Sequence, residues 1–288
     1  MKKTQWVALV IVTLLLSGLL TSCSGDKAGD GKQAPANRLE AIKARGYLEV
    51  ATEPYFAPYE FIDPSLPGDE KYVGADIELA RYIAEKIGVE CRIVPLEFSA
   101  VLASITEGKY DMAISALAYT PERAEAMIIS KGYYFDENEP GHGLMIREEL
   151  RDVIKSADDL ADYVVVCQSG SLQELYATTQ IPSCKELKRV SATTDGFLMV
   201  QEGKADVCVT AIPMGQLYID ANEGCGLIIV EGFEFETDPD TLGSRIGMPK
   251  GEVELEAFVN EVIAEVLASG VFEKWYAEYT EYAKRLGV

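Results

Sequence analysis

One arginine lies in a position where a folded chain commonly binds an anion. Thr120 predicts the N-cap of a helix and Pro121 its first turn, which places Arg123 among free backbone N–H groups and the positive end of the helix dipole. A guanidinium there can grip a carboxylate through two parallel hydrogen bonds. On the residues alone, a surface ion pair of Arg123 with Glu122 or Glu125 is the simpler interpretation, and both interpretations stay open.

Other chemistries find little support. His142 is the only histidine, so neither a His-rich metal site nor a histidine pair can form. It lies between Gly141 and Gly143, which favours a hinge residue over a catalytic base. No Walker-type GxxxxGK occurs, so ATP hydrolysis would belong to a partner subunit. We expect no cofactor, no metal and no catalytic residue.

The N-terminus predicts export. Lys2 and Lys3 precede an uncharged, Leu/Val-rich stretch at 6–22, which is short for a spanning helix of about 20 residues and typical of a signal peptide. Its end, LTSC (20–23), resembles the bacterial lipobox, in which the cysteine is acylated and becomes the first residue after cleavage. The less favoured alternative is a plain signal peptide with Cys23 there by chance. No later stretch is apolar enough to span a bilayer.

The remaining cysteines carry a weaker prediction. The chain has six cysteines, so an acylated Cys23 leaves an odd number. Three lie in apolar strand-like runs, where a free thiol behaves as a small buried hydrophobe: Cys91, Cys167 and Cys208. Cys184 and Cys225 lie in polar sequence and could pair in an oxidising compartment, although leaving them unpaired is the favoured interpretation. No CxxC or Cys/His spacing indicates a metal.

Charge limits the partners. The chain has 26 Lys and Arg against 47 Asp and Glu, a formal net charge of −21. Such a surface repels phosphate backbones, so we expect no nucleic-acid partner. The polar segment that follows Cys23 is too poor in apolar residues to fold and should be a flexible tether. The lipid anchor would then be the only membrane attachment, and we expect a monomer.

The ordered part alternates strand and helix signals, which predicts α/β architecture with mostly parallel sheets. Expected strands are 47–52, 91–96, 110–115, 163–167 and 205–211, and expected helices are 74–88, 99–108, 120–127, 171–179 and 194–203. Ser156 and Asp159 predict a capping box. A C-terminal helix shows one apolar face, made of Leu255, Phe258, Val259, Val262, Ile263, Val266 and Leu267, and an aromatic helix follows near Trp275, Tyr276 and Tyr279.

A local pattern occurs twice. ITEGKYDMAIS (105–115) and VQEGKADVCVT (200–210) both read as helix end, Glu-Gly-Lys, Asp and buried strand. Two occurrences do not make a solenoid. The pattern instead predicts two lobes that each build a sheet in the same way.

With these features in place, the sequence resembles the extracytoplasmic solute-binding proteins for polar amino acids, the capture components of ABC importers. Four blocks in the family's order carry the resemblance: 46–61, 72–125, 163–171 and 202–213. It implies a two-lobed periplasmic-binding-protein-like fold of type II, in which two crossing strands, near 140–147 and 232–247, join lobes that close on a ligand. The expected division is a signal peptide at 1–22, a lipidated tether at 23–37, lobe 1 at 38–142 and 236–288, and lobe 2 at 143–235.

The resemblance also implies a ligand site. Arg123 matches the arginine that binds the ligand's α-carboxylate, and Phe56 and Phe98 match two aromatic residues that sandwich its side chain, although such residues also serve as small core anchors. Glu53 would reach the distal polar end, favouring a basic or amide side chain. The cleft would be completed by Ser115, Ala116, Leu117, Gln168, Ser171 and Leu172.

Three departures weaken the match. Ala118 replaces a common hydroxyl residue, and so does Leu172, which offers only its backbone N–H. Ala211 stands where the family presents an aspartate to the ligand's α-ammonium, and a buried ammonium without an anion is costly. Either another carboxylate substitutes, with Asp195, Glu139 and Glu53 as candidates, or the ligand lacks a standard α-amino group.

Three functions are compatible with these residues. The favoured one is capture of a small polar solute, with an amino acid expected, for an ABC permease and ATPase. The second is enzymatic, because cyclohexadienyl dehydratases resemble the same family and use the cleft for acid-assisted loss of water. The third is a sensing module of a receptor, which no signalling domain supports. We expect a non-enzyme on the outer side of the cell membrane or in the periplasm.

Overall fold

The structure is a computed structural model that describes residues 35–135 and 141–288. The predicted signal peptide (1–22), the lipidation site Cys23, most of the tether and Glu139 lie outside the described residues. Within the described ranges, none of the helices has both the length and the apolar character needed to cross a bilayer.

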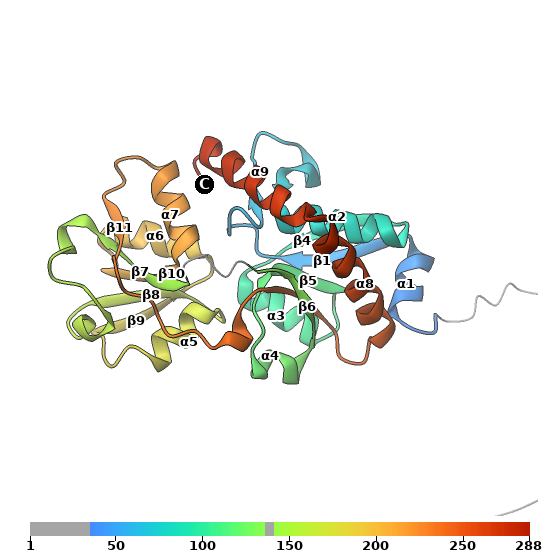
Figure 1. Cartoon of the computed structure of the whole chain (residues 1–288), viewed down its shortest axis with the longest axis horizontal. Coiled ribbons are helices and arrows are strands. Elements are labelled where there is room, and N and C mark those ends of the chain that lie inside the picture. The colour runs from blue at the N-terminus through green and yellow to red at the C-terminus, as the bar shows by residue number, and fades with distance from the viewer. Residues whose placement is uncertain (1–34, 136–140) are drawn as a thin grey trace, which may run out of the picture. The chain divides into compact units, whose positions relative to one another are not determined.

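Two five-stranded sheets form the centres of two lobes, seen in Figure 1 as two separate groups of strands. In sheet order, the first lobe contains β4 (Glu90–Pro95), β1 (Tyr47–Thr52), β5 (Met112–Leu117), β12 (Ser244–Met248) and β6 (Ile128–Tyr134). The second contains β11 (Leu227–Ile229), β7 (His142–Arg147), β10 (Val207–Ala211), β8 (Val164–Gln168) and β9 (Glu186–Val190). A small ribbon pairs β2 (Phe61–Ile62) with β3 (Tyr72–Val73).

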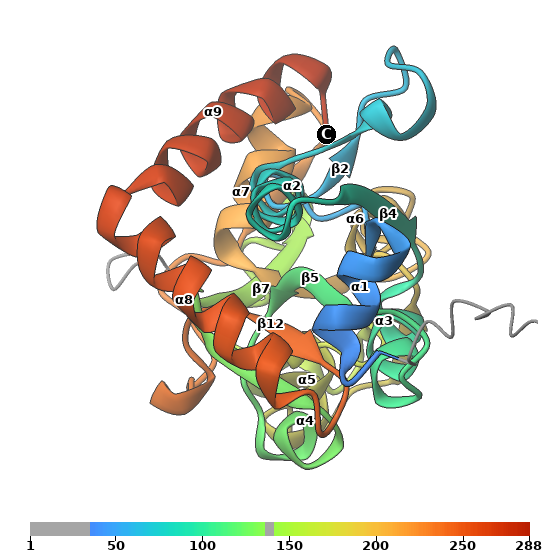
Figure 2. The same cartoon turned by 90° about the vertical axis from the view of Figure 1, so that its right-hand side faces the viewer.

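Helices cover both sheets. Around the first sheet lie α1 (Arg38–Arg45), α2 (Ala75–Ile87), α3 (Phe98–Thr106), α4 (Pro121–Ala126), α8 (Val253–Ser269) and α9 (Val271–Leu286). Around the second lie α5 (Leu172–Thr179), α6 (Thr193–Gln201) and α7 (Ile212–Ala221). The short 3-10 turns are η1 (Gly68–Lys71), η2 (Glu148–Leu150), η3 (Ala157–Leu160) and η4 (Pro239–Thr241). Figure 2 shows α1, α8 and α9 near one another, and contacts join α1 to α8 and α8 to α9.

Each sheet contains one reversed strand, and it is the strand that arrives from the other lobe. β12 is antiparallel to both β5 and β6, and β7 is antiparallel to both β10 and β11. All the other pairs are parallel. The predicted fold class is therefore confirmed as a two-lobed α/β fold, with sheets that are mixed rather than purely parallel.

The crossings also hydrogen-bond to the second lobe and to each other. The chain leaves the first sheet after β6, enters the second at β7, and returns between β11 and β12. Phe235 N donates to His142 O (2.8 Å), and Gly141 O accepts from Ile212 N (2.9 Å). The division at 142/143 and 235/236 stays a prediction.

Local sequence explains the best-predicted elements. α2 begins after Gly74 and ends at Gly88, whose left-handed backbone (φ 86°) closes the helix. On α8, Leu255, Val259, Val262, Ile263 and Val266 are buried as expected. Leu267 departs from that face: its side chain is 48% exposed, because its position on the helix lies outside the buried stripe.

The duplicated pattern builds the same joint in each lobe. Gly108 (φ 69°) and Gly203 (φ 71°) end α3 and α6 in left-handed turns. One carboxylate oxygen of the next aspartate then accepts the backbone N–H of the neighbouring strand: Glu49 N to Asp111 (2.8 Å) and Val164 N to Asp206 (2.9 Å). Arginines pair with both aspartates: Arg38 and Arg45 with Asp111, and Arg147 with Asp206. The prediction that both lobes build their sheets alike is confirmed.

The five cysteines within the described ranges are all free. Cys184 packs against one apolar cluster of the second lobe and Cys225 against another, so the alternative of a disulfide between them is wrong. Cys167 and Cys208 are buried as expected, whereas Cys91 is half-buried.

Candidate functional site

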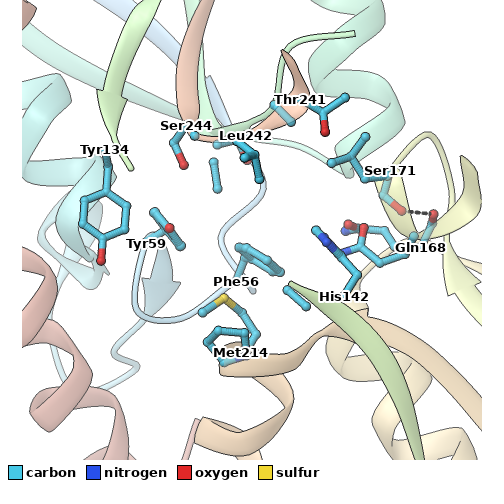
Figure 3. A pocket seen from close by; sticks show the side chains of 18 of the residues that line it. Phe56, Tyr59, Tyr134, His142, Gln168, Ser171, Met214, Thr241, Leu242 and Ser244 are labelled. Carbon is cyan, nitrogen blue, oxygen red and sulfur yellow. Dashed lines mark hydrogen bonds between the residues drawn. The ribbon is translucent and has the colours of Figure 1, made fainter. Parts of the chain in front are cut away.

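A pocket of about 180 Å³ is lined by residues of both lobes (Figure 3). All but one of the predicted site residues line it: Glu53, Phe56, Phe98, Ser115, Ala116, Arg123, Gln168, Ser171, Leu172 and Ala211. The exception is Leu117. Its side chain is fully buried in an apolar cluster with Phe98 and Met127 and does not reach the pocket.

Four of the lining residues occupy equivalent positions in the two lobes. β5 pairs with β1 as β10 pairs with β8, with Val50 opposite Met112 and Val165 opposite Val207. By this register Glu53 corresponds to Gln168, and Ala116 to Ala211. All four lie at the carboxyl ends of parallel strands, where α/β folds commonly bind ligands.

Arg123 is a buried cation whose hydrogen bonds go to backbone carbonyls. Its side chain donates to Ala118 O (2.8 Å) and, across the two lobes, to Gly170 O (3.1 Å). Thr120 caps the helix as predicted, accepting from Arg123 N at 3.1 Å. The residue is 8% exposed, and no carboxylate of the described ranges lies within ion-pair distance of it. Burial lowers the pKa of Arg123 to about 10, which leaves it charged at neutral pH.

Glu53 is a buried acid in the same pocket. Only 1% of it is exposed, and its Oε1 has no hydrogen-bond partner among the described residues. Burial raises the pKa of the Glu53 carboxyl to about 8; a hydrogen bond with Gln168 lowers it, and the nearby charge of Asp195 raises it. At neutral pH this carboxyl is mostly protonated in the absence of a ligand.

Two further carboxyls lie next to Glu53. Glu60, which lines the pocket, accepts the Ser115 hydroxyl at 2.7 Å, and Ser115 in turn accepts Glu53 N at 3.1 Å. Asp76 accepts the Tyr133 hydroxyl at 2.8 Å. Burial raises the pKa of Glu60 well above its usual range and that of Asp76 to about 6.

Ala116 has an unusual backbone. Its φ of 45° makes it the only residue other than glycine with positive φ in the described part of the chain. Asp76 holds this conformation by accepting Ala116 N at 2.7 Å. Strained backbone that is over-determined by its surroundings is common at ligand sites.

Both predicted aromatic residues line the pocket, and each also contacts a neighbouring protein group. The Arg123 guanidinium lies 5.5 Å from the centre of the Phe98 ring, so Phe98 supports the cation as well as facing the pocket. Phe56 stacks on Tyr59 (5.9 Å), which meets Tyr134 edge-on (6.1 Å). One wall of the pocket is thus continuous with the aromatic core of the first lobe.

The second lobe contributes both apolar and polar side chains to the pocket. Figure 3 shows Met214 of α7 next to Phe56, and Ala211 and Pro213 line the pocket beside it. Ser171 Oγ donates to Gln168 O at 2.7 Å. His142 also lines the pocket, packs edge-on against Tyr176 (5.0 Å), and has a pKa lowered by burial to about 4.

Several lining residues are absent from the sequence prediction: Tyr59, Glu60, Tyr134, Met214, Thr241, Leu242 and Ser244. Glu60 offered a signal, because a charged residue stands there between aromatic residues. Thr241, Leu242 and Ser244 lie on the return crossing, where residue types give no signal. Among the described residues, no group of three His, Cys, Asp or Glu side chains could hold a metal ion.

The structure narrows the candidates for an anion in place of the missing aspartate. Asp195 is exposed and does not line the pocket, and Glu139 lies outside the described residues. Glu53 lines the pocket, and Glu60, not a candidate from the sequence, does so too.

Comparison with known proteins agrees with this geometry. "Probable histidine-binding protein" of Campylobacter jejuni is 30% identical over 191 residues, 65% of this chain and 67% of that protein. "Arginine-binding extracellular protein ArtP" of Bacillus subtilis is 27% identical over 278 residues, 94% of this chain and 95% of that protein. The crystal structure of an amino acid ABC transporter substrate-binding protein from Streptococcus pneumoniae, bound to L-arginine, superposes with a TM-score of 0.76 at 26% identity, covering 85% of this chain and 98% of that one.

One family pattern covers most of this chain. The sequence pattern of the bacterial extracellular solute-binding proteins, family 3, matches residues 48–282, which include both sheets apart from Tyr47 and all the pocket-lining residues. The two lobes, the pocket that both of them line and the duplicated strand ends are the structural counterpart of that match. This chain belongs to the bacterial extracellular solute-binding proteins, family 3.

Proposed function

We propose that this protein captures an amino acid in the pocket between its lobes and delivers it to an ABC importer. Relatives and structural neighbours named for binding histidine, arginine or cystine support an amino acid as the class of ligand. Closure of the lobes on the ligand would create the shape that the permease recognises.

The observation that carries the proposal is Arg123. A buried cation with no carboxylate partner in the described structure is costly unless an anion binds it. Arg123 lines a pocket sized for a small molecule, and a guanidinium can donate two parallel hydrogen bonds to a ligand carboxylate.

Glu53 indicates the opposite end of the ligand. Its buried carboxyl lines the same pocket and has an unpartnered oxygen, which favours a basic or amide-bearing side chain. The remaining site roles are proposals of the same kind: Phe56 and Phe98 would flank the ligand, and Ser115, Ala116, Gln168, Ser171 and Leu172 would line it. Because Ala211 presents no charge, a carboxylate ligand without a standard α-amino group is the alternative ligand.

The proposal includes a location outside the cytoplasm. The family is extracellular. Acylation of Cys23, outside the described residues, would tether a monomer to the membrane, with ABC permease and ATPase subunits as partners. Replacing Cys23 by serine should release the protein into the soluble fraction; sedimentation with membranes after that change would contradict the anchor.

The decisive experiment combines a ligand screen with one substitution. A thermal-shift screen of residues 35–288 against the standard amino acids and their deaminated analogues should identify a ligand, because saturation at about 100 times Kd adds about 2.7 kcal/mol of stability. Arg123→Met should weaken that ligand at least ~100-fold in calorimetry, since it removes a desolvated charge partner.

The matched control is Arg151→Met, because Arg151 is exposed and does not line the pocket. It should leave the affinity unchanged. Unchanged affinity in Arg123→Met would rule out the carboxylate role. A response to deaminated carboxylates alone would replace the amino acid by the alternative ligand.

A second function has one observation in its favour. A dehydratase needs a cleft carboxylic acid that is protonated at neutral pH, and Glu53 meets that requirement. One relative, from Pseudomonas aeruginosa, is named cyclohexadienyl dehydratase. Formation of an aromatic product from a cyclohexadienyl substrate, abolished by Glu53→Gln, would establish this activity; a stable complex without turnover would exclude it.

A further inference from the structure

Three acidic side chains are buried together behind one side of the pocket. Glu53 and Glu60 line the pocket and Asp76 lies behind them, and all three are almost completely shielded from solvent. None of the ion pairs in the described part of the chain involves any of them. Three uncompensated negative charges at such a place would be prohibitively costly, so the group must hold protons when no ligand is bound.

The hydrogen bonds indicate where one of these protons lies. Asp76 is held as an acceptor by Ala116 N (2.7 Å) and the Tyr133 hydroxyl (2.8 Å). The charge of Asp76 raises the pKa of Glu60, so of these two neighbouring buried carboxyls Glu60 is the one that holds a proton. Glu60 accepts the Ser115 hydroxyl through Oε1, whereas its Oε2, like Oε1 of Glu53, has no hydrogen-bond partner among the described residues.

Of the two acids that line the pocket, Glu53 is the one that also contacts the second lobe. Its Oε1 has no partner, whereas the carboxyl as a whole meets the Gln168 amide across the two lobes. The other charged groups that face it are acidic: Asp195 of α6, and Glu60 beside Ser115 of β5. His142 of β7 lines the same pocket and is kept neutral by burial. The cation Arg123 of α4 lines the pocket too but belongs to its anion-binding end.

We propose that the ligand carries a cationic group which docks on Glu53, and that its arrival expels the proton that Glu53 holds in the empty pocket. The proton passes to solvent, and the carboxylate left behind becomes the counter-ion of the ligand. This inference rests on the proposed function, because it assigns the chemistry of the amino acid's cationic end.

Binding should therefore depend on pH in a range where exposed carboxyls do not titrate. Below the pKa of about 8 in the empty protein, each ligand bound must release close to one proton. Linkage then makes the affinity rise about tenfold per pH unit between pH 6.5 and 8 and level off above it. A neutral side chain that accepted a hydrogen bond from protonated Glu53 would release no proton.

The experiment is calorimetry of residues 35–288 with L-arginine at pH 7, in two buffers with different ionisation enthalpies. The difference in measured heat counts the protons released, and we expect close to one. In Glu53→Gln the release should vanish and the pH slope should flatten, while any residual binding through Arg123 continues. Asp195→Asn is the matched control: it removes a neighbouring exposed carboxylate that does not line the pocket and should leave the release in place.

The outcomes separate the two claims. L-Arginine binding without proton release, or with release that persists in Glu53→Gln, overturns this inference and leaves amino-acid capture standing. Binding of neutral amino acids such as L-glutamine with rejection of L-arginine also overturns this inference and leaves amino-acid capture standing. Failure of every amino acid in the thermal-shift screen overturns the proposed function and this inference together.

Discussion

At the scale of single residues, the pocket brings together charges that the protein does not pair internally. Arg123 is buried with its hydrogen bonds to backbone carbonyls, and Glu53 is buried with one oxygen unpartnered. The two groups do not neutralise each other, since burial is the main influence on each pKa. A zwitterionic ligand with separated charges would satisfy both, which is why an empty pocket of this kind is costly to keep.

That cost predicts how stability depends on pH. An acid whose folded pKa is raised binds its proton more tightly when folded, so Glu53 (4.5 to about 8) makes the free energy of unfolding fall as pH rises between those values. His142, lowered from 6.5 to about 4, acts oppositely but only between pH 4 and 6.5. The ligand-free protein should therefore lose stability from pH 6.5 to 8, by up to about 1.4 kcal/mol per unit for one group.

Urea denaturation at pH 6.5, 7.2 and 8 measures this fall. Glu53→Gln should remove the share that Glu53 contributes, because an amide does not titrate, whereas Glu60, whose pKa is also raised by burial, keeps its own share. A wild-type curve that is flat or rises over this range would show that Glu53 is already ionised in the empty pocket.

At the scale of elements, the duplicated pattern is a joint between a helix and two strands. Asp111 and Asp206 occupy the same place in the two lobes, yet their surroundings differ. The Asp111 side chain is fully buried between Arg38 and Arg45, whereas that of Asp206 is 26% exposed beside Arg147. A matched pair of substitutions at these two aspartates can therefore separate the effect of burial from the effect of their shared place in the fold.

Asp111→Asn should destabilise the protein by about 3 kcal/mol, because it leaves two arginines without a buried counter-ion. Asp206→Asn should cost about 1 kcal/mol, since solvent can replace part of the lost interaction. Chemical denaturation of the two variants checks the order. Equal losses would show that the burial of Asp111 does not set the cost of removing its charge.

The turn into α2 offers a second test. A Cβ on Gly74 (φ 131°) would lie 2.1 Å from Tyr59 O, so Gly74→Ala should destabilise by about 3 kcal/mol or more. Gly88 (φ 86°) ends the same helix with no atom within 4 Å of its Cβ position, so Gly88→Ala should cost only about 1–2 kcal/mol. Thermal unfolding compares the two. A larger loss at Gly88 would contradict the steric argument.

Elements with strong local signals were predictable from the sequence. The β1 strand and α2 matched because an apolar run and a glycine-bounded periodic stretch leave few alternatives. α7 was not predicted: Pro213 and Gly215 lower helix propensity, and Gly215 is required because its Cβ would lie 2.8 Å from Ile229. That helix owes its place to packing, which only the folded chain reveals.

The site residues also fall into those that could be predicted from the sequence and those that could not. Positions at strand ends were predictable because the resemblance fixes their order along the chain, although their ligand roles stay untested. Glu60, Tyr134 and Ser244 were not, because they reach the pocket from segments whose proximity depends on tertiary structure. The expected contribution of Leu117 is through its backbone and stays a prediction, because the structure shows only that its side chain packs in an apolar cluster away from the pocket.

At the scale of the whole molecule, the C-terminal helix also contacts the second lobe. Leu217 of α7 is buried in a cluster with Phe61, Val73 and Ala283, against which Leu286 and Val288 pack. This contact lies beside the pocket-lining Met214 on the same helix. Any movement of one lobe against the other must therefore accommodate the packing between α7 and α9.

Leu217→Ala should destabilise the protein by about 2–4 kcal/mol through the cavity it leaves, and should change ligand affinity although Leu217 does not line the pocket. Leu267→Ala, at an exposed position of α8, should cost less than about 0.5 kcal/mol and leave affinity unchanged. Calorimetry and denaturation of both variants provide the test. Unaltered affinity in Leu217→Ala would show that the contact is independent of ligand binding.

The interior position of β12 also affects how the molecule can be made. The second sheet uses strands that are consecutive along the chain, β7 to β11, but the first sheet has a gap between β5 and β6 until β12 is available. A growing polypeptide that does not yet include β12, which begins at Ser244, cannot complete the first sheet. The part synthesised first is thus the part finished last.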